Sequence, residues 1–170
     1  MHIDLNVITK TLCSETAGFN LIHFKDVQHL KEVGAHYWVT ISLGDDKYML
    51  ISMVTSQMQK LERVYKFNNQ EKAINCLVPV SRNEFPAIGK GCVVNCNETL
   101  LLTKEELILK IDTNYSSRIT SNCLDCIHYD YEFEDDFKRK IIKAIENSPL
   151  VKGEVKKALL VIKESIQPAA

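Results

Sequence analysis

One imidazole and two hydroxyls stand at the ends of the most regular segment of this sequence, HYWVTISLGDDKYMLISMVTSQ at residues 36–57. His36 opens the segment, and Thr55 and Ser56 lie where its second extended run stops. Hydroxyls at the end of a strand usually cap backbone groups of a turn. They can also border a place where a ligand is bound or cut. The free pKa of histidine, about 6.5, lets His36 hold or release a proton at neutral pH.

A basic stretch follows these hydroxyls. Residues 57–90 contain three acidic residues and six basic ones: Lys60, Arg63, Lys66, Lys72, Arg82 and Lys90. Residues 125–136 instead contain six acidic residues. The basic stretch could bind phosphate and the acidic one would repel it, although solvated basic side chains near loops are also common.

The cysteines form a third candidate group. CLDCIH at residues 123–128 supplies Cys123, Cys126 and His128, ligand types that suit a tetrahedral zinc site if a fourth ligand joins them. Cys92 and Cys96 stand four apart on a predicted strand, which places them about 13 Å apart. Two residues so placed do not share one ion. Buried thiols that pack as small hydrophobes are the simpler interpretation of all these residues.

Length and composition limit the class of protein. The chain has 170 residues, 45% hydrophobic and 25% charged, with a net charge of −1, as in an ordinary globular protein with one core and an added segment. No apolar run reaches the length of about 18 residues that crosses a bilayer, and the first residues lack the pattern of a signal peptide. With six cysteines, the sequence predicts a cytoplasmic protein that does not enter membranes.

The first half of the chain is predicted to be mostly strands. Residues 24–33 show a helical spacing, whereas residues 36–43 and 47–54 are rich in β-branched and aromatic residues around the turn sequence GDD. Residues 62–67, 74–80 and 90–96 are predicted as further strands, with Pro79 indicating an edge. Several short strands without long crossover helices favour a small antiparallel barrel or a coiled sheet.

The second half is predicted to be helical. Thr103 and Glu106 have the spacing of a capping box at the start of TKEELILKI, residues 103–111. Two longer amphipathic helices follow, over residues 133–148 and 151–166, with Pro149 in their connection. Their expected buried residues are Phe133, Phe137, Ile141 and Ile145 in the first, and Val155, Leu159 and Ile162 in the second.

Residues 34–111 resemble the MazF/PemK-like toxin family of SH3-like barrels. The resemblance lies in VTSQ at residues 54–57, which is similar to the family's threonine-ended strand, and in EFPAIGKGCVVNC at residues 84–96 before a capped helix. It implies a metal-independent endoribonuclease that cleaves single-stranded RNA, in which a 2′-OH attacks the adjacent phosphate. Such chemistry needs a base, an acid, and donors for the charge that develops on the phosphorane.

The resemblance also implies roles for particular residues. Thr55 and Ser56 would donate to the phosphate, His36 or a nearby arginine would transfer the proton, and the RNA would be held by the basic residues Lys60, Arg63 and Arg82. The family's Arg-Pro step, which opens the preceding strand, has no counterpart in HYWVTIS. Either His36 takes its place or the site is altered, and GAHYWV at residues 34–39 also aligns with the family's first strand.

The fold class predicted is therefore mainly β with helical additions. It comprises an N-terminal extension over residues 1–33, an SH3-like barrel with a capped helix over residues 34–111, and a helical appendage over residues 112–170. The expected partners are RNA, an antitoxin protein and a second copy in a homodimer, with no cofactor and no metal in the site. The rival hypothesis is a catalytically inactive barrel that binds protein or RNA.

Overall fold

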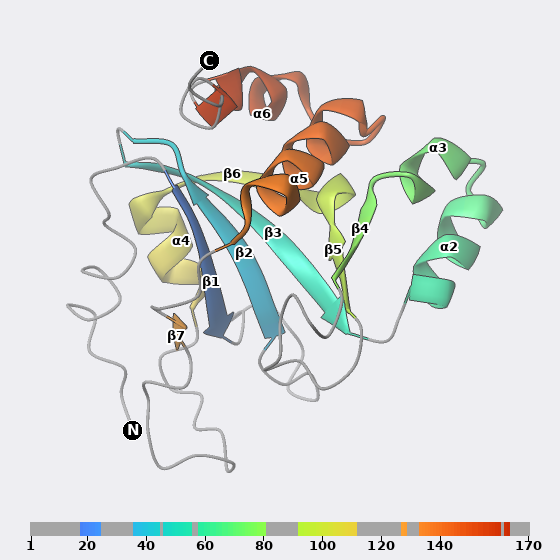
Figure 1. Cartoon of the computed structure of the whole chain (residues 1–170), viewed down its shortest axis with the longest axis horizontal. Coiled ribbons are helices and arrows are strands. Elements are labelled where there is room, and N and C mark those ends of the chain that lie inside the picture. Colours follow the sequence, from blue (N-terminus) through green and yellow to red (C-terminus); the bar gives the residue numbers. More distant parts are fainter. Residues whose placement is uncertain are drawn as a thin grey trace, which may run out of the picture. The chain divides into compact units, whose positions relative to one another are not determined.

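The computed structural model describes residues 18–24, 36–44, 46–55, 58–80, 92–111, 127–128, 133–160 and 162–163 (Figure 1). The chain forms two compact units. The first contains Met1–Leu50 and Leu101–Phe133, and the second contains Ile51–Leu100 and Glu134–Ala170. Strand β3 begins in the first unit and ends in the second.

The first unit is built on strands β1 (Gly18–Phe24), β2 (His36–Ser42) and the start of β3 (Lys47–Thr55). β1 pairs antiparallel with β2, from Gly18 opposite Ser42 to Phe24 opposite His36. β7 (Ile127–His128) pairs antiparallel with the other edge of β1, and β6 (Leu100–Thr103) pairs with β3. Strand β1 falls in the segment predicted as an extension, and its sequence gave no expectation of a strand.

The turn between β2 and β3 is the one that GDD predicts. Leu43 N donates to Lys47 O at 2.9 Å, and Lys47 N donates to Gly44 O at 3.1 Å. Gly44 has φ +76° and Asp46 has φ +55°. Glycine and aspartate tolerate this left-handed backbone better than most residues do, so the residue types fit the turn.

Trp38 lies in the buried core of the first unit. Its ring stacks on that of Phe24, with centroids 5.1 Å apart, and its Nε1 donates to the carbonyl of Phe24 at 3.3 Å. Tyr48 and Leu107 complete this buried cluster together with Ile111. Trp38 is therefore a packing residue and offers no exposed ring for a ligand.

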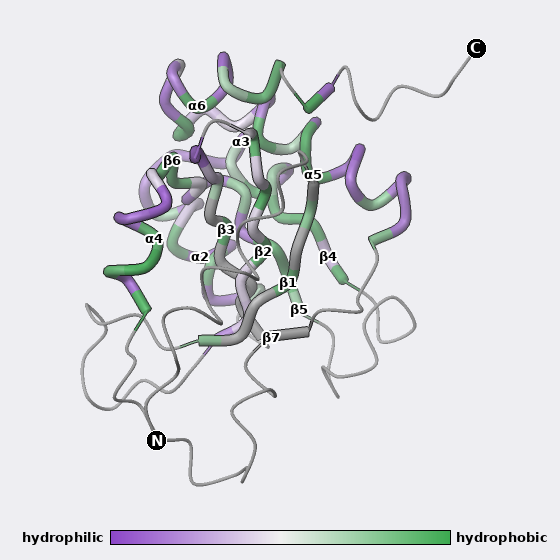
Figure 2. The backbone as a smooth tube through the Cα atoms, turned by 90° about the vertical axis from the view of Figure 1, so that its left-hand side faces the viewer, coloured by the Kyte–Doolittle hydropathy of each residue, from purple (hydrophilic) through white to green (hydrophobic). Residues whose placement is uncertain are grey.

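The capping box that the sequence predicts at residue 103 is present. Helix α4 (Lys104–Lys110) begins after Thr103, whose Oγ1 accepts from Glu106 N at 3.2 Å. Glu106 Oε2 in turn accepts from Thr103 N at 2.8 Å. Helix α4 carries both hydrophilic and hydrophobic residues (Figure 2), and Leu107 is buried.

The second unit contains a small antiparallel arrangement of strands. β5 (Cys92–Asn95) pairs with the end of β3 on one side and with β4 (Leu77–Val80) on the other. Among the described strands β4 pairs with β5 alone, so β4 is an edge strand, where proline is tolerated. The prediction that Pro79 lies on an edge strand is confirmed.

Two helices of the second unit follow the predicted pattern. α5 (Asp135–Asn147) buries Phe137, Ile141 and Ile145. The next helix, α6 (Gly153–Ala158), buries Val155, and Leu159 and Ile162 beyond it are also buried. Phe133, just before α5, is buried in the first unit. The predicted helices and their inward residues are confirmed within the described part of the chain.

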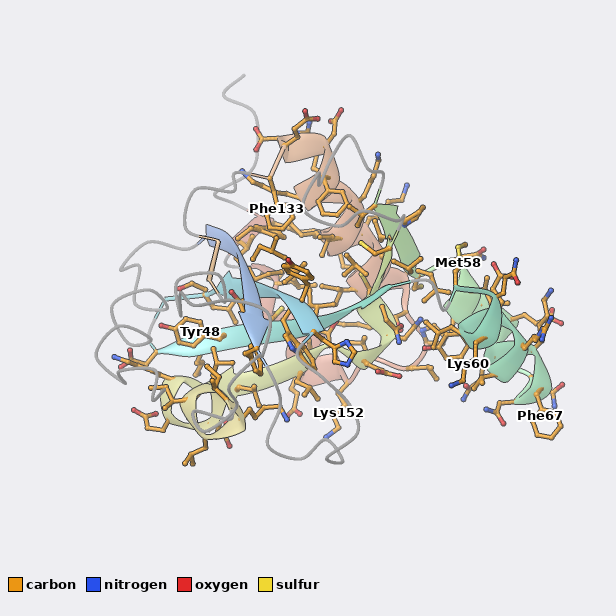
Figure 3. All side chains as sticks on the ribbon, turned by 90° about the horizontal axis from the view of Figure 1, so that it is seen from below. Tyr48, Met58, Lys60, Phe67, Phe133 and Lys152 are labelled. Atoms are coloured by element: carbon orange, nitrogen blue, oxygen red, sulfur yellow. The ribbon has the colours of Figure 1, made fainter. Side chains whose placement is uncertain are left out.

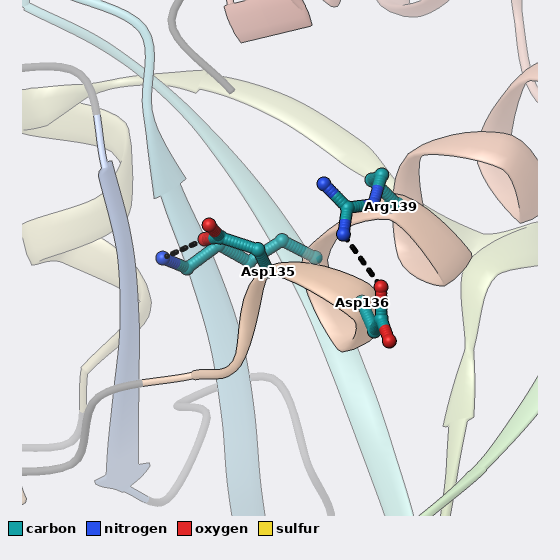
Figure 4. A network of polar contacts seen from close by, with 4 residues as sticks. Asp135, Asp136 and Arg139 are labelled. Atoms are coloured by element: carbon teal, nitrogen blue, oxygen red, sulfur yellow. Dashed lines mark hydrogen bonds and ion pairs between the residues drawn. The ribbon is translucent and has the colours of Figure 1, made fainter. Parts of the chain in front are cut away.

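The first turn of α5 also carries two ion pairs (Figure 4). Lys138 Nζ lies 3.0 Å from Asp135 Oδ1, and Arg139 Nη2 lies 2.5 Å from Asp136 Oδ1. The hydrogen bond and charge of Arg139 hold the pKa of Asp136 below its ordinary value. Both pairs are exposed, so they contribute little to stability.

One predicted strand is wrong. Residues 62–67, ERVYKF, belong to helix α2 (Met58–Phe67), which is followed by α3 (Glu71–Ile74). Leu61 and Tyr65 lie four residues apart and both face inward, which matches the period of a helix. As a strand, the same residues would have no continuous buried face. The expected helical turn over residues 24–33 lies outside the described residues, except for Phe24, which ends β1.

Antiparallel strands with packed helices are thus shown, in agreement with the coarse prediction. The described strands form no closed barrel. The SH3-like barrel and its boundaries at residues 33 and 111 stay predictions. Within the described residues, no helix is both long and apolar enough to cross a membrane.

Candidate functional site

Strand β3 ends at Thr55, as the sequence predicts, and helix α2 begins at Met58. The backbone of Thr55 pairs with Cys92 in β5, which fixes the strand end in the second unit. Ser56 and the side chain of Thr55 lie outside what the structure describes. The site can therefore be built from the next element, α2, whose side chains are placed.

The inner face of α2 is anchored by Tyr65. Its ring packs in a buried cluster with Ala73, Leu77 and Val93, and its hydroxyl donates to Asn95 Oδ1 at 3.1 Å. Burial raises the pKa of Tyr65, and this effect exceeds the opposing one of the Asn95 hydrogen bond. Tyr65 is thus a neutral, buried anchor and holds α2 by one face.

A buried polar network continues from this anchor. Asn97 Nδ2 donates to Ala73 O at 2.8 Å and to Asn95 Oδ1 at 3.2 Å. Asn97 Oδ1 accepts from Ser148 Oγ at 2.8 Å, which ties η1 (Cys96–Glu98) to the end of α5. Asn95 Nδ2 is buried without a hydrogen-bond partner among the described residues. The network makes a rigid support for α2 and α3.

The outer face of α2 combines cations with apolar side chains. Lys60, Arg63 and Lys66 are exposed, and no ion pair joins them to an acid within the described part of the chain. Phe67 is 88% exposed and Val64 is 44% exposed. Figure 3 shows the side chains of Lys60 and Phe67 projecting from α2 into open space. We call Lys60, Arg63, Val64, Lys66 and Phe67 the outer face of α2.

The end of α2 is closed by a Schellman motif. Gln70 N donates to Tyr65 O at 2.8 Å, and Asn69 N donates to Lys66 O at 3.1 Å. Asn69 has φ +55°, the left-handed conformation that this motif requires. The chain therefore leaves the helix in a fixed direction, with Asn68 and Asn69 exposed beside Phe67.

The predicted site residues fall into three groups. Lys60 and Arg63 lie together on the outer face of helix α2, in a part of the chain where a strand was predicted over residues 62–67. His36 is the first residue of β2, half-buried, and belongs to the first unit, whereas Thr55 belongs to the second. Ser56 and Arg82 lie outside the described residues. The grouping of His36 with Thr55 and Ser56 stays a prediction.

The described cysteines are structural. Cys76, Cys92 and Cys96 are buried, and burial raises the pKa of the Cys76 and Cys96 thiols. Cys96 begins η1, so the prediction that it shares a strand with Cys92 is wrong because β5 ends at Asn95. Cys123 and Cys126 lie outside the described residues, as does the side chain of His128. The described residues contain no group of three His, Cys, Asp or Glu that could hold a metal.

The chain matches no protein-family model and no curated protein. Its possible chemistry therefore follows from the residues themselves. Three cations that face water can attract a phosphate backbone, and an exposed aromatic ring beside them can stack on a base.

The sequence predicted all three cations of this arrangement, Lys60, Arg63 and Lys66, as phosphate-binding candidates, but it did not predict the exposure of Phe67. It placed that ring on a strand, where alternation would turn it toward a core. Leu61 and Tyr65 lie four residues apart, which is the spacing of inward-facing residues on a helix. This spacing could have predicted a helix with Phe67 exposed on its other face.

Proposed function

We propose that this protein binds single-stranded RNA through the outer face of α2 and cleaves it as a toxin-like, metal-independent endoribonuclease of a toxin–antitoxin system. One observation carries the proposal. Lys60, Arg63 and the exposed ring of Phe67 share one helix face, and that helix begins three residues after the strand end at Thr55.

The binding step uses the cations and the ring. Each lysine or arginine that neutralises a phosphate releases counterions, which favours binding at low salt. A base stacked on an aromatic ring adds about 1–3 kcal/mol and needs an unpaired strand. The outer face of α2 offers both contacts, so single-stranded RNA suits it better than a duplex.

The cleavage step uses the residues at the strand end. A ribose 2′-OH loses its proton to a base and forms a bond to the adjacent phosphorus, while the bond to the 5′-oxygen of the next nucleotide breaks and that oxygen takes up a proton. The products are a 2′,3′-cyclic phosphate and a 5′-OH. We assign the proton transfer to His36 and the donation to the phosphate oxygens to Thr55 and Ser56, with Arg82 as a further RNA contact.

The proposal includes the finer architecture and partners. Residues 34–111 would form an SH3-like barrel, and the toxin would be restrained by an antitoxin protein and would act as a homodimer. These features come from the resemblance to the MazF/PemK-like family.

A second candidate function is a barrel that binds RNA or protein without cleaving it. The observation that favours it is the sequence HYWVTIS, which opens with His36 and lacks the Arg-Pro step of the family. As an RNA-binding module, this candidate uses the same outer face of α2 and differs from the first in having no cleavage chemistry.

Cleavage in the presence of EDTA tests the proposal. The purified protein is incubated with mixed-sequence RNA, and the ends are analysed for cyclic phosphate. We expect cleavage by the wild type and by Lys143→Gln, an exposed control on α5, and a loss of at least about tenfold in His36→Ala and Thr55→Ala. RNA that is bound but intact at high protein concentration would establish the second candidate. RNA that is neither bound nor cut would reject both RNA-based readings.

A further inference from the structure

The packing of helix α2 does not require an exposed aromatic side chain at Phe67. Phe67 is the most exposed of the large hydrophobic side chains among the described residues, at 88%. Tyr65, two positions earlier, is buried, so the helix could have kept a polar residue at position 67 without loss of its core. A single exposed apolar residue is ordinary, but this one stands among cations and amides.

The three residues that follow Phe67 all have carboxamide side chains. Asn68, Asn69 and Gln70 follow it, the first two exposed and Gln70 half-buried. Each carboxamide presents one acceptor and two donors, a pattern that can pair with the edge of a base. The Schellman motif fixes their backbone, since Gln70 N and Asn69 N both bond back into α2.

Asn69 is the informative residue in this turn. Its φ of +55° is a conformation in which glycine carries no steric cost and is the usual residue. Asparagine is the next most tolerated, and it supplies a carboxamide that glycine lacks. The turn thus keeps a polar side chain where the fold alone would favour none.

We infer that the end of α2 is a nucleobase-reading site, in which Phe67 stacks on one unpaired base of RNA and the carboxamides of Asn68 and Asn69 bond to its edge. This inference rests on the proposed function and adds which base of the RNA is recognised. A carboxamide pairs in a bidentate manner with the adjacent donor and acceptor of adenine. Since adenine is the usual partner of asparagine in such pairs, the inference includes adenine as the preferred base.

The surroundings of Phe67 favour a nucleic acid over an apolar protein surface. Its helix neighbours on the outer face include Arg63 and Lys66, which attract the phosphates on either side of a stacked base. Between residues 58 and 72 the chain has four basic and two acidic residues. An apolar docking surface would instead need further exposed apolar residues, and the outer face offers only Val64, at 44%.

Binding of short RNAs tests the inference. Labelled six-nucleotide oligo(A), oligo(C) and oligo(U), 2′-O-methylated so that the attacking hydroxyl is blocked, are titrated with wild type, Phe67→Ala, Phe67→Leu and the double variant Asn68→Ala/Asn69→Gly, and fluorescence anisotropy is measured. The glycine suits the left-handed position, so the double variant keeps the turn, and urea unfolding verifies that each variant is folded. His36 and Thr55 are unchanged in all of them.

We expect the wild type to prefer oligo(A). Phe67→Ala and Phe67→Leu should weaken all three RNAs by about tenfold, because the stacking ring is lost. The double variant should keep most of its affinity and lose the preference for adenine.

A failure of this inference can be distinguished from a failure of the proposed function. A wild type that binds none of the RNAs overturns the proposed function as well as this inference. Binding that is equal in the wild type and the Phe67 variants overturns only the base-reading site. Loss of a dimer in Phe67→Ala, with unchanged RNA affinity, would show that the ring is a protein contact and would also overturn it.

Discussion

The hydroxyl of Tyr65 donates a hydrogen bond to Asn95 Oδ1, 3.1 Å away, and so joins helix α2 to the end of strand β5. The same helix exposes Phe67 two residues later. One helix thus carries an anchor on its inner face and an unburied ring on its outer face. Variants of the anchor and of the outer face should therefore affect different properties.

Tyr65→Phe should change how stability depends on pH. The pKa of Tyr65 is raised by burial, so the folded protein keeps this proton at a pH where the unfolded chain loses it. The free energy of unfolding of the wild type should then fall as pH rises above about 10, the ordinary value for tyrosine. Tyr65→Phe removes this contribution, so its stability should fall less steeply.

Urea unfolding between pH 8 and pH 11 measures the effect. At pH 8 the variant should be less stable by about 1 kcal/mol because the hydrogen bond is lost. The thiols of Cys76 and Cys96, whose pKa values burial also raises, are common to both proteins, so the comparison isolates the effect of the Tyr65 hydroxyl. Parallel curves for the two proteins would contradict the prediction.

Asn97→Ala should be strongly destabilising. The carboxamide donates to Ala73 O and Asn95 Oδ1 and accepts from Ser148 Oγ, all in buried surroundings. Removing it leaves buried polar groups without partners, at a cost of about 2–4 kcal/mol in the free energy of unfolding. Asn147→Ala, at an exposed position on α5, is the matched control and should change stability by less than about 0.5 kcal/mol. Equal stability of the two variants would show that the network contributes nothing.

The elements with strong local signals were predictable from the sequence. The turn at Gly44, the cap at Thr103 and the stripe of Phe137, Ile141 and Ile145 each depend on residues close together in the chain. Backbone conformation, end capping and helical period decide such features without reference to distant segments. They were expected and they are present.

The elements that depend on distant pairing were missed or misjudged. Strand β1 forms because residues 18–24 pair with β2, and the polar positions within GFNLIHF gave no alternating pattern. Residues 62–67 were predicted as a strand, but they belong to helix α2, on which Val64 and Phe67 are exposed. Of the proposed site, only the charges were predicted from the sequence. The exposure of the ring followed from the tertiary packing of Tyr65.

Thr103→Ala tests the cap of α4. The variant loses the acceptor for Glu106 N, which should reduce the free energy of unfolding by about 1 kcal/mol. Glu106→Ala should cost less, and the double variant should cost less than the sum, since the two hydrogen bonds are reciprocal. Thermal unfolding of the four proteins measures the coupling. Strict additivity would mean that the box does not act as a unit.

Lys60→Gln/Arg63→Gln should reduce the salt dependence of RNA binding. Each phosphate contact on a single strand contributes about 0.7 to the slope of log affinity against log salt, so loss of two contacts should reduce the steepness by about 1.4. Lys143→Gln removes one exposed positive charge from α5, away from the outer face of α2, and should leave the slope within error of the wild type. Anisotropy titrations with 2′-O-methylated oligo(A), which cannot be cleaved, between about 50 and about 300 mM salt give the slopes. Because Tyr65 and the buried network hold α2 from its inner face, the double variant should unfold like the wild type. An unchanged slope in a folded double variant would place the phosphate contacts elsewhere and remove the observation on which the RNA proposal rests.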